Sequence, residues 1–315
     1  MDIQAYYPSA PPEYEITQLR EEERKELQTE LKSSRYSVNI EEFLRTVNSK
    51  IKLSYPNVAT LNAVFTDKTS PHLALLIRSL KRVVCLLKKY KCNKHLIFWL
   101  IPTLSHRSFP KPGEVLSEIH INGGYTYPMR NTVYIYRFEE FPKVMLHETI
   151  HHLPMDTGHK WDHQDLMKLY NVLHIDTTNC NQTCSTDIMP NEAIVETWAE
   201  VYHLAFLELE FHIPFQQMLQ HEKNWAAIQT KRIKIHQKKY FPEWKENTHA
   251  YSYVVIRAAL LWNLAAFLSI KAPYNQNILT NLILESISKP DFIAAVEKAT
   301  IPTHDSFRMT LFGSL

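Results

Sequence analysis

The sequence predicts an α+β fold in which a small sheet, packed on a central helix, precedes a mainly helical half. The apolar run at 95–102 and the alternating, β-branched run at 131–137 are typical of strands. From Glu139 onward, the spacing of apolar residues is almost wholly helical. With 315 residues, 45% of them hydrophobic, the chain is long enough to bury a sizeable core.

The elements are expected in the following order. Residues 1–15, rich in Pro and Tyr, form a disordered tail. Residues 16–33 form a charged helix, a second helix follows Ser37 and extends through Ile51, and a third begins at Pro71. A turn near residues 118–124 joins extended segments. Further helices are expected at 141–152, 163–173, 190–212, 214–238, 251–271, 276–288 and 290–299. We therefore divide the chain into the tail, a segment 16–160 and a helical half 161–315.

Composition and charge exclude several function classes. A net charge of +2 does not provide the broad basic surface that binds nucleic acid. No apolar stretch reaches the ~20 residues that span a bilayer, and the acidic, proline-rich start is not a signal peptide. We therefore expect an intracellular protein with reduced cysteines. Cys180 and Cys184 fit either two free loop thiols or a second metal site with His174.

Residues 144–153, VMLHETIHHL, carry the chemistry. On a helix, His147 and His151 lie four apart on one face and can share one zinc ion, while Glu148 can reach a water at that ion. In a chain of this composition, the H-E-x-x-H spacing would arise by chance at most about 0.08 times. The apolar flanks favour a buried site over a surface helix with clustered histidines. His152 points about 100° away and is interpreted as a supporting or structural residue.

A third zinc ligand is expected on the segment 190–206. Glu192, Glu196 and Glu200 are four apart on one helical face, between apolar residues. Burying such carboxylates is costly unless a cation balances them. One carboxylate can bind the metal while the next, one turn on, holds a ligand histidine. The alternative is a solvent-facing acidic stripe.

The H-E-x-x-H motif followed by N-E-A-I-V-E at 191–196 resembles the gluzincins, the thermolysin-like clan of zinc peptidases. The resemblance implies one zinc per chain, a glutamate as third ligand, and Glu148 as the general base for peptide hydrolysis. Two registers fit: Glu192 supported by Glu196, or Glu196 supported by Glu200. We prefer Glu196, because the small Ala199 allows close helix approach.

The same resemblance implies further roles. Gluzincins use a Tyr or His from the helical half to stabilise the oxyanion, and Tyr253, with His249 second, is the candidate here. The strand at 131–137 is expected to border the cleft and pair with an extended protein or peptide substrate. The whole chain also resembles the zinc metalloproteinases encoded by large DNA viruses. That likeness implies work in the host cytoplasm or in a virion.

The N-terminus contains two overlapping short motifs, P-S-A-P and P-P-E-Y. Their residues are Pro8, Ser9, Ala10, Pro11, Pro12 and Tyr14. The ESCRT adaptor domain and WW domains bind such segments as polyproline II, and the overlap resembles viral late-budding motifs. The alternatives are an inert tail and, for the whole protein, a non-catalytic scaffold that recruits partners through these motifs.

Overall fold

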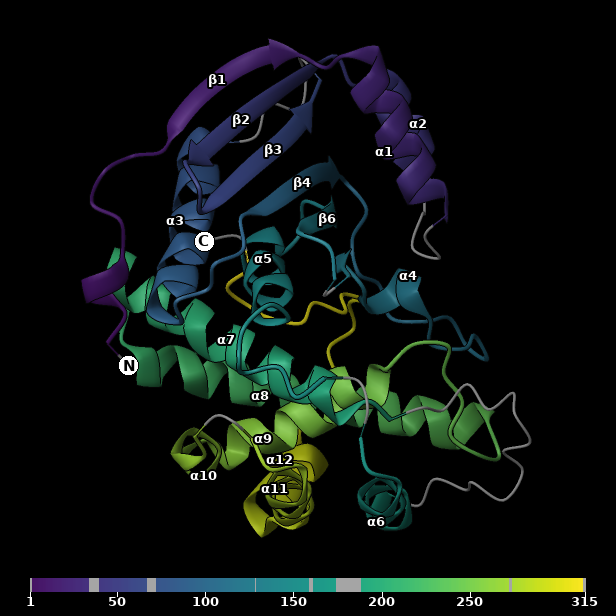
Figure 1. Ribbon diagram of the computed structural model, residues 1–315. Helices are drawn as coiled ribbons and strands as arrows, with labels where there is room; N and C mark the ends of the chain where they lie inside the picture. The colour runs from purple at the N-terminus through teal and green to yellow at the C-terminus, as the bar shows by residue number, and fades with distance from the viewer. Residues whose placement is uncertain are drawn as a thin grey trace.

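A mixed six-stranded sheet organises the first half of the chain (Figure 1). The computed structural model describes residues 2–33, 40–66, 72–127, 129–158, 161–173, 188–271 and 274–313. The strands are β1 (Glu13–Gln18), β2 (Ser49–Tyr55), β3 (Ala59–Phe65), β4 (Leu96–Thr103), β5 (Gly124–Thr126) and β6 (Thr132–Arg137). Their order is β1-β2-β3-β4-β6-β5. The pairs β3–β4 and β4–β6 are parallel and the others antiparallel, so β1 and β5 are the edges.

The second half is mainly helical, which confirms the predicted α+β class. The helices are α1 (Glu21–Ser33), α2 (Ile40–Thr46), α3 (Leu73–Lys89), α4 (Glu118–Ile121), α5 (Phe141–Ile150), α6 (His163–Leu173), α7 (Pro190–Phe211), α8 (Phe215–Tyr240), α9 (Arg257–Trp262), α10 (Leu264–Ser269), α11 (Gln276–Ser288) and α12 (Pro290–Lys298). The helix expected at 251–271 is divided, because it begins as a π-helix, η2 (Tyr251–Ile256), and breaks at Asn263.

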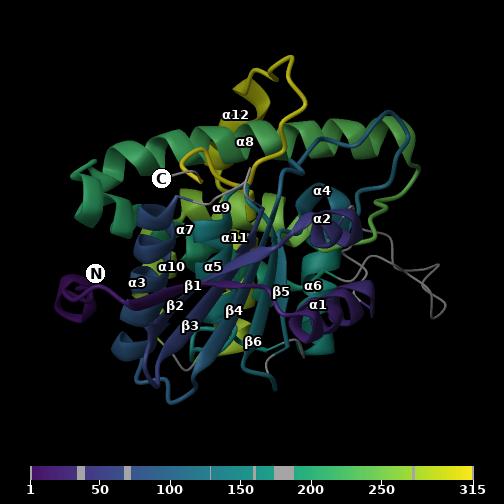
Figure 2. The same cartoon turned by 90° about the horizontal axis from the view of Figure 1, so that it is seen from above.

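Helices cover both faces of the sheet. On one face, α3 and α5 pack against alternate strand residues such as Leu61, Phe98 and Ile135, and this core continues into α7 and the later helices. On the other face, α1 and α2 pack on Val64, Ile101 and other alternate residues. In Figures 1 and 2, α5 lies between the sheet and α7, so the central helix is enclosed by both halves of the chain.

Two N-terminal predictions are wrong. Residues 16–18 belong to β1 rather than to the first helix, which begins at Glu21. The second helix ends at Thr46, and Ile51 lies in β2. Within the turn expected near residues 118–124, residues 118–121 form the short helix α4. The apolar spacing from Ile40 to Ile51 suits a helix, but pairing of Ser49–Tyr55 with β3 determines the outcome.

The expected disordered tail is also contradicted. Ile3, Pro8 and Pro12 are buried, and a short 3-10 helix, η1 (Gln4–Tyr6), lies between Ile3 and Pro8. The Tyr7 hydroxyl donates to Glu210 (2.7 Å), and Tyr14 pairs with Leu53 across β1 and β2. Several weak contacts together offset the conformational entropy that this segment loses on ordering, although its composition alone suggests disorder.

Some sequence features lie outside the described residues, namely Cys180, Cys184 and His174. Among the described residues, no helix has the length and apolarity needed to cross a bilayer.

Candidate metal centre

Helix α5 carries the H-E-x-x-H motif in the interior of the protein. Pro142 occupies its first turn, where the missing N–H costs nothing. All ten residues of α5 are buried, because the sheet, α3 and α7 surround it. His151 caps the helix with αR backbone angles, so it keeps the helical register with His147. Their Nε2 atoms are 3.2 Å apart.

The acidic face of α7 lies against α5 rather than in solvent. Glu192 and Glu196 are each 5% exposed, and Glu200 is fully buried. The alternative of a solvent-facing acidic stripe is therefore excluded. Buried carboxylates require compensating charge, and here they meet two histidines, a lysine and an arginine.

His147, His151 and Glu192 form a cluster that could hold a metal ion. Glu192 Oε2 lies 3.4 Å from His147 Nε2 and 3.7 Å from His151 Nε2. Atoms bound tetrahedrally to zinc at 2.0–2.1 Å would lie about 3.3 Å from one another. The donor set and its spacing therefore fit a zinc ion with one coordination position left for another ligand.

The second nitrogen of each histidine is held by a carboxylate. His147 Nδ1 contacts Glu196 (2.8 Å) and His151 Nδ1 contacts Asp156 (2.9 Å). If each Nδ1 carries the proton, the Nε2 lone pairs face the cluster, as in carboxylate–histidine–metal arrangements. Asp156 was not anticipated from the sequence, although it follows the motif closely.

The geometry reverses the sequence-based preference for Glu196 as third ligand. Glu192 is the carboxylate beside both Nε2 atoms, and Glu196 supports His147 from one turn on. The small side chain of Ala199 does not decide which glutamate binds the metal, because close packing of α7 on α5 alone does not determine which turn of α7 faces the two histidines. Glu196 also pairs with Lys143, which lies 3.3 Å from Glu200, and Arg257 in turn contacts Glu200 (3.2 Å). These opposite charges offset one another in the interior of the protein.

The electrostatics of the cluster favour a cation. Burial alone would lower the pKa of His147, but hydrogen bonds with Glu192 and Glu196 outweigh it and raise that pKa to about 10. The pKa values of both glutamates fall well below their usual range despite burial, through the histidines and, for Glu196, through Lys143. A proton or a metal ion can supply the positive charge that these carboxylates stabilise.

Glu148 and Tyr253 border the cluster. Glu148 is 5% exposed, and burial raises its pKa against the opposing effect of the two histidines. The Tyr253 hydroxyl donates to Glu192 Oε2 (2.8 Å), and its ring lies 5.9 Å from that of His147. Burial, reinforced by Glu192, raises the pKa of Tyr253 far enough to keep it a donor at neutral pH. The π-helix that carries Tyr253 is a distortion often found at functional sites.

The two other candidates lie at the margin. His249 is half-buried, and its carbonyl oxygen accepts a hydrogen bond from Tyr253 N (3.0 Å) at the start of the π-helix. His152 Nε2 lies 3.0 Å from the Thr126 hydroxyl, and burial lowers the pKa of His152 to about 4. His152 therefore ties α5 to the sheet edge, as its predicted structural role requires.

A narrow cavity opens beside the cluster, between β5 and the start of α5. It is lined by His147, Glu148 and Tyr253, by the Gly123–Gly124 pair, and by residues distant in sequence such as Met309. A Cβ on Gly124 would lie 2.9 Å from Val144 Cγ1 and 2.8 Å from the Tyr134 carbonyl oxygen. Glycine is therefore required for β5 to approach α5, a role that the sequence pattern did not indicate.

No family model, curated protein or solved structure matches this chain.

Proposed function

We propose that the protein is a zinc-dependent peptidase. One observation carries the proposal: His147, His151 and Glu192 converge at ligand spacing while Glu148 lies beside them on the wall of a cavity. Two imidazoles and a carboxylate are the donor set of catalytic zinc sites that keep one position open. A structural zinc site would use four protein ligands, and among the residues that the structure describes the cluster contains three.

The roles of the residues follow from this arrangement. When bound, zinc supplies Lewis acidity, which lowers the pKa of water to about 7 and polarises a carbonyl. Glu148 accepts the proton that the attacking water loses and passes it to the leaving amine. Its pKa, raised by burial, suits a group that takes and then returns a proton. Glu196 and Asp156 hold the two histidines in the required orientation.

Tyr253 is the proposed donor to the developing oxyanion. Its hydroxyl stays protonated and already lies in the cluster, hydrogen-bonded to Glu192. Transfer of this hydrogen bond to the substrate oxygen requires rotation of one side chain. Loss of a single such donor costs about 10²–10³ in kcat.

The strand that would pair with substrate differs from the one expected. β6, at 132–137, is paired with β4 on one side and with β5 on the other, so its backbone is not available at a sheet edge for pairing with a substrate. β5 is the edge, and Gly123 and Gly124 line the cavity. We therefore assign the proposed substrate pairing to β5.

The motif pair also supports membership of the gluzincins, in the register where Glu192 is the ligand and Glu196 its supporting neighbour. The further likeness to metalloproteinases of large DNA viruses stands as part of the same proposal, together with an intracellular or virion location.

The test combines metal analysis with peptide hydrolysis. Purified protein should hold about one zinc per chain, and His147→Ala should lose it. Glu148→Gln should keep its zinc and lose hydrolysis of a diverse peptide mixture, because the proton acceptor is gone while the ligands remain. Full zinc retention by His147→Ala, or undiminished hydrolysis by Glu148→Gln, contradicts the proposal.

A further inference from the structure

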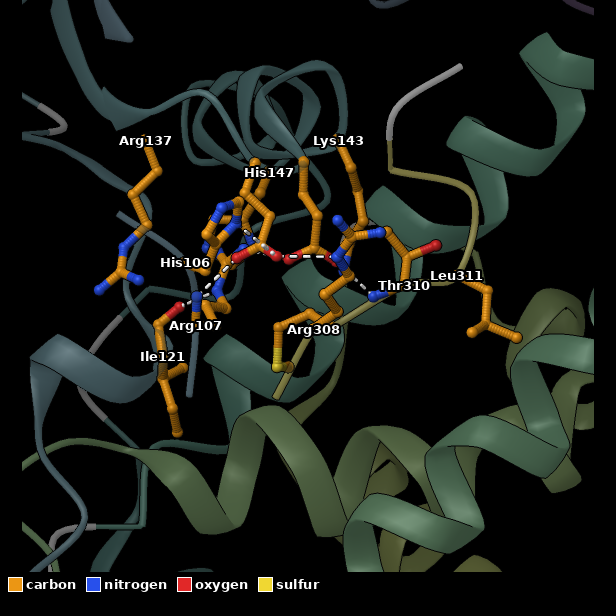
Figure 3. A network of polar contacts seen from close by, with 12 residues as sticks. His106, Arg107, Ile121, Arg137, Lys143, His147, Arg308, Thr310 and Leu311 are labelled. Carbon is orange, nitrogen blue, oxygen red and sulfur yellow. Dashed lines mark hydrogen bonds and ion pairs between the residues drawn. The ribbon is translucent and has the colours of Figure 1, made fainter. Parts of the chain in front are cut away.

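The segment 306–313 crosses the candidate centre, although it lies far from α5 in sequence. The segment contacts the residues that flank the catalytic candidates on both sides. Thr310 N donates to Glu140, just before α5 (2.5 Å), and Arg257, in the helix after Tyr253, donates to the Met309 carbonyl oxygen (2.6 Å). Figure 3 shows Arg308 and Thr310 in the polar network with Lys143 and His147. Met309 is 4% exposed, and it lines the cavity with His147, Glu148 and Tyr253.

This segment is held firmly. Thr310 Oγ1 and Leu311 N both donate to buried Glu222 (2.6 and 2.7 Å), and Trp225 Nε1 donates to the Arg308 carbonyl (2.8 Å). A Cβ on Gly313 would lie 2.4 Å from Glu140 Cγ, so the chain packs directly on that side chain. A segment with this many attachments is a wall rather than a loose loop.

The cavity bounded by Met309 is small. Its volume is about 40 Å³, room for a few water molecules at most. Ile121, Val144 and the two glycines of the sheet edge are the other apolar residues around the cavity, and a Cβ on Gly124 would clash with Val144. The cavity cannot widen toward the sheet, and Met309 is the longest unbranched apolar side chain in its wall, so a change at Met309 should alter the size of the cavity.

The arginine and the lysine around the cavity are already paired. Arg107 forms an ion pair with Glu140, and Lys143 forms one with Glu196. An incoming acidic side chain would have to separate one of these buried pairs, which is costly. Any charged side chain would also lose its hydration in so small a cavity.

We propose that Met309 is a specificity-determining residue that restricts this cavity to a small, uncharged side chain, such as that of Gly, Ala or Ser, next to the cleaved bond. The proposal rests on the peptidase function proposed above. A large side chain meets the Met309 thioether, and steric exclusion of this kind discriminates by about 10–200-fold in kcat/KM.

The experiment compares the zinc-loaded wild type with Met309→Leu, Met309→Val and Met309→Ala. The substrates are peptides in which one residue on either side of the cleaved bond is Gly, Ala, Ser, Leu, Phe, Lys or Glu. Wild type should favour the small uncharged residues at one of the two positions. At that same position, Met309→Ala should lower the Ala-over-Leu preference at least about tenfold, with Met309→Val intermediate.

Met218→Ala is the matched control. Met218 is a fully buried methionine of α8 that does not line the cavity, so its truncation should lower stability without changing the preference. If Met309→Ala does not fold, the Leu and Val variants still report a graded change. A preference that is the same in wild type and in every folded Met309 variant overturns the proposal.

Peptide binding separates this proposal from the peptidase function. Affinities of the same peptides for Glu148→Gln, with and without Met309→Ala, are measured by calorimetry. Binding that favours small residues and broadens with Met309→Ala supports the cavity wall even if wild type cleaves nothing. Cleavage by wild type with an unchanged preference in the Met309 variants supports the peptidase and refutes the wall. Peptides that neither bind nor are cleaved refute both.

Discussion

Glu192 and Glu196 meet the same histidine from successive turns of α7, and their tasks differ. Glu192 Oε2 faces both Nε2 atoms, whereas Glu196 contacts His147 Nδ1 on the far side of the ring. We therefore expect Glu192→Gln to lose zinc on dialysis. Glu196→Gln keeps an acceptor for His147 and should weaken zinc binding by about 10–100-fold. Zinc affinity measured by competition with a chelator distinguishes the two.

The two substitutions are matched controls for each other, since both remove one charge from α7 and preserve side-chain volume. Tight zinc binding by Glu192→Gln together with zinc loss from Glu196→Gln would restore the register preferred from the sequence.

At the scale of elements, β1 places the proline motifs in a folded context. Pro8 and Pro12 are buried, while Ser9, Ala10 and Pro11 are exposed. The Tyr55 hydroxyl donates to the Ala10 carbonyl (2.7 Å), and the Tyr14 side chain is 60% exposed but its backbone belongs to the sheet. Recognition as polyproline II therefore requires this segment to leave the sheet.

We expect the full chain to bind a WW domain at least about tenfold more weakly than a peptide of residues 5–20, because detaching β1 reduces the competent population. Tyr55→Phe should reduce the difference in affinity between the full chain and the peptide, because it removes the hydrogen bond to the Ala10 carbonyl oxygen. Fluorescence anisotropy measures both, with Tyr14→Ala as the variant that binds in neither form. The ESCRT adaptor should show the same difference at Pro8–Pro11. Equal affinities of chain and peptide would show that docking does not restrain the motif.

At the scale of the whole molecule, the metal and the fold should support each other. The buried carboxylates Glu148, Glu192 and Glu196 lose a compensating charge when zinc is removed. A ligand present at about a thousand times its Kd stabilises the folded state by about 4 kcal/mol. Chelation should therefore lower the Tm of wild type by roughly 5–10 °C.

Thermal unfolding with and without a chelator tests this expectation. The Tm of His147→Ala should not respond to the chelator, since that variant has no zinc to lose. A wild-type Tm that likewise does not change when the chelator is added would mean that the centre carries no metal.

The sequence predicted the strongly periodic parts of the molecule well. The strands near 95–102 and 131–137 are confirmed, as are the helices from α5 onward except the one expected at 251–271, because segments with one clear period rarely fit another structure. The His147–His151 pair was readable because helix geometry alone brings residues four apart together. The strands β1, β2 and β3 could not be predicted in this way, since short segments of mixed polarity take their conformation from the strands with which they pair.

The remaining errors share a physical cause. Assigning Glu192 required the position of α7 relative to α5, which no local pattern encodes. Asp156, Lys143 and Met309 enter the site through tertiary packing, and a lone Asp, Lys or Met carries no signal of it. The composition of the tail predicts disorder because composition does not reveal the burial of Ile3 or the hydrogen bond from Tyr7 to Glu210.

The cavity wall also bears on how the protein folds. His147 and Glu196 are 49 residues apart, whereas 170 residues separate Glu140 from Thr310, which fixes the wall. The entropy of loop closure makes the longer connection slower to form. We therefore expect the contact between α5 and α7 to form before segment 306–313 closes the cavity. If the proposed metal site and the proposed specificity hold, metal binding and substrate selectivity are acquired as separate kinetic events in one folding reaction.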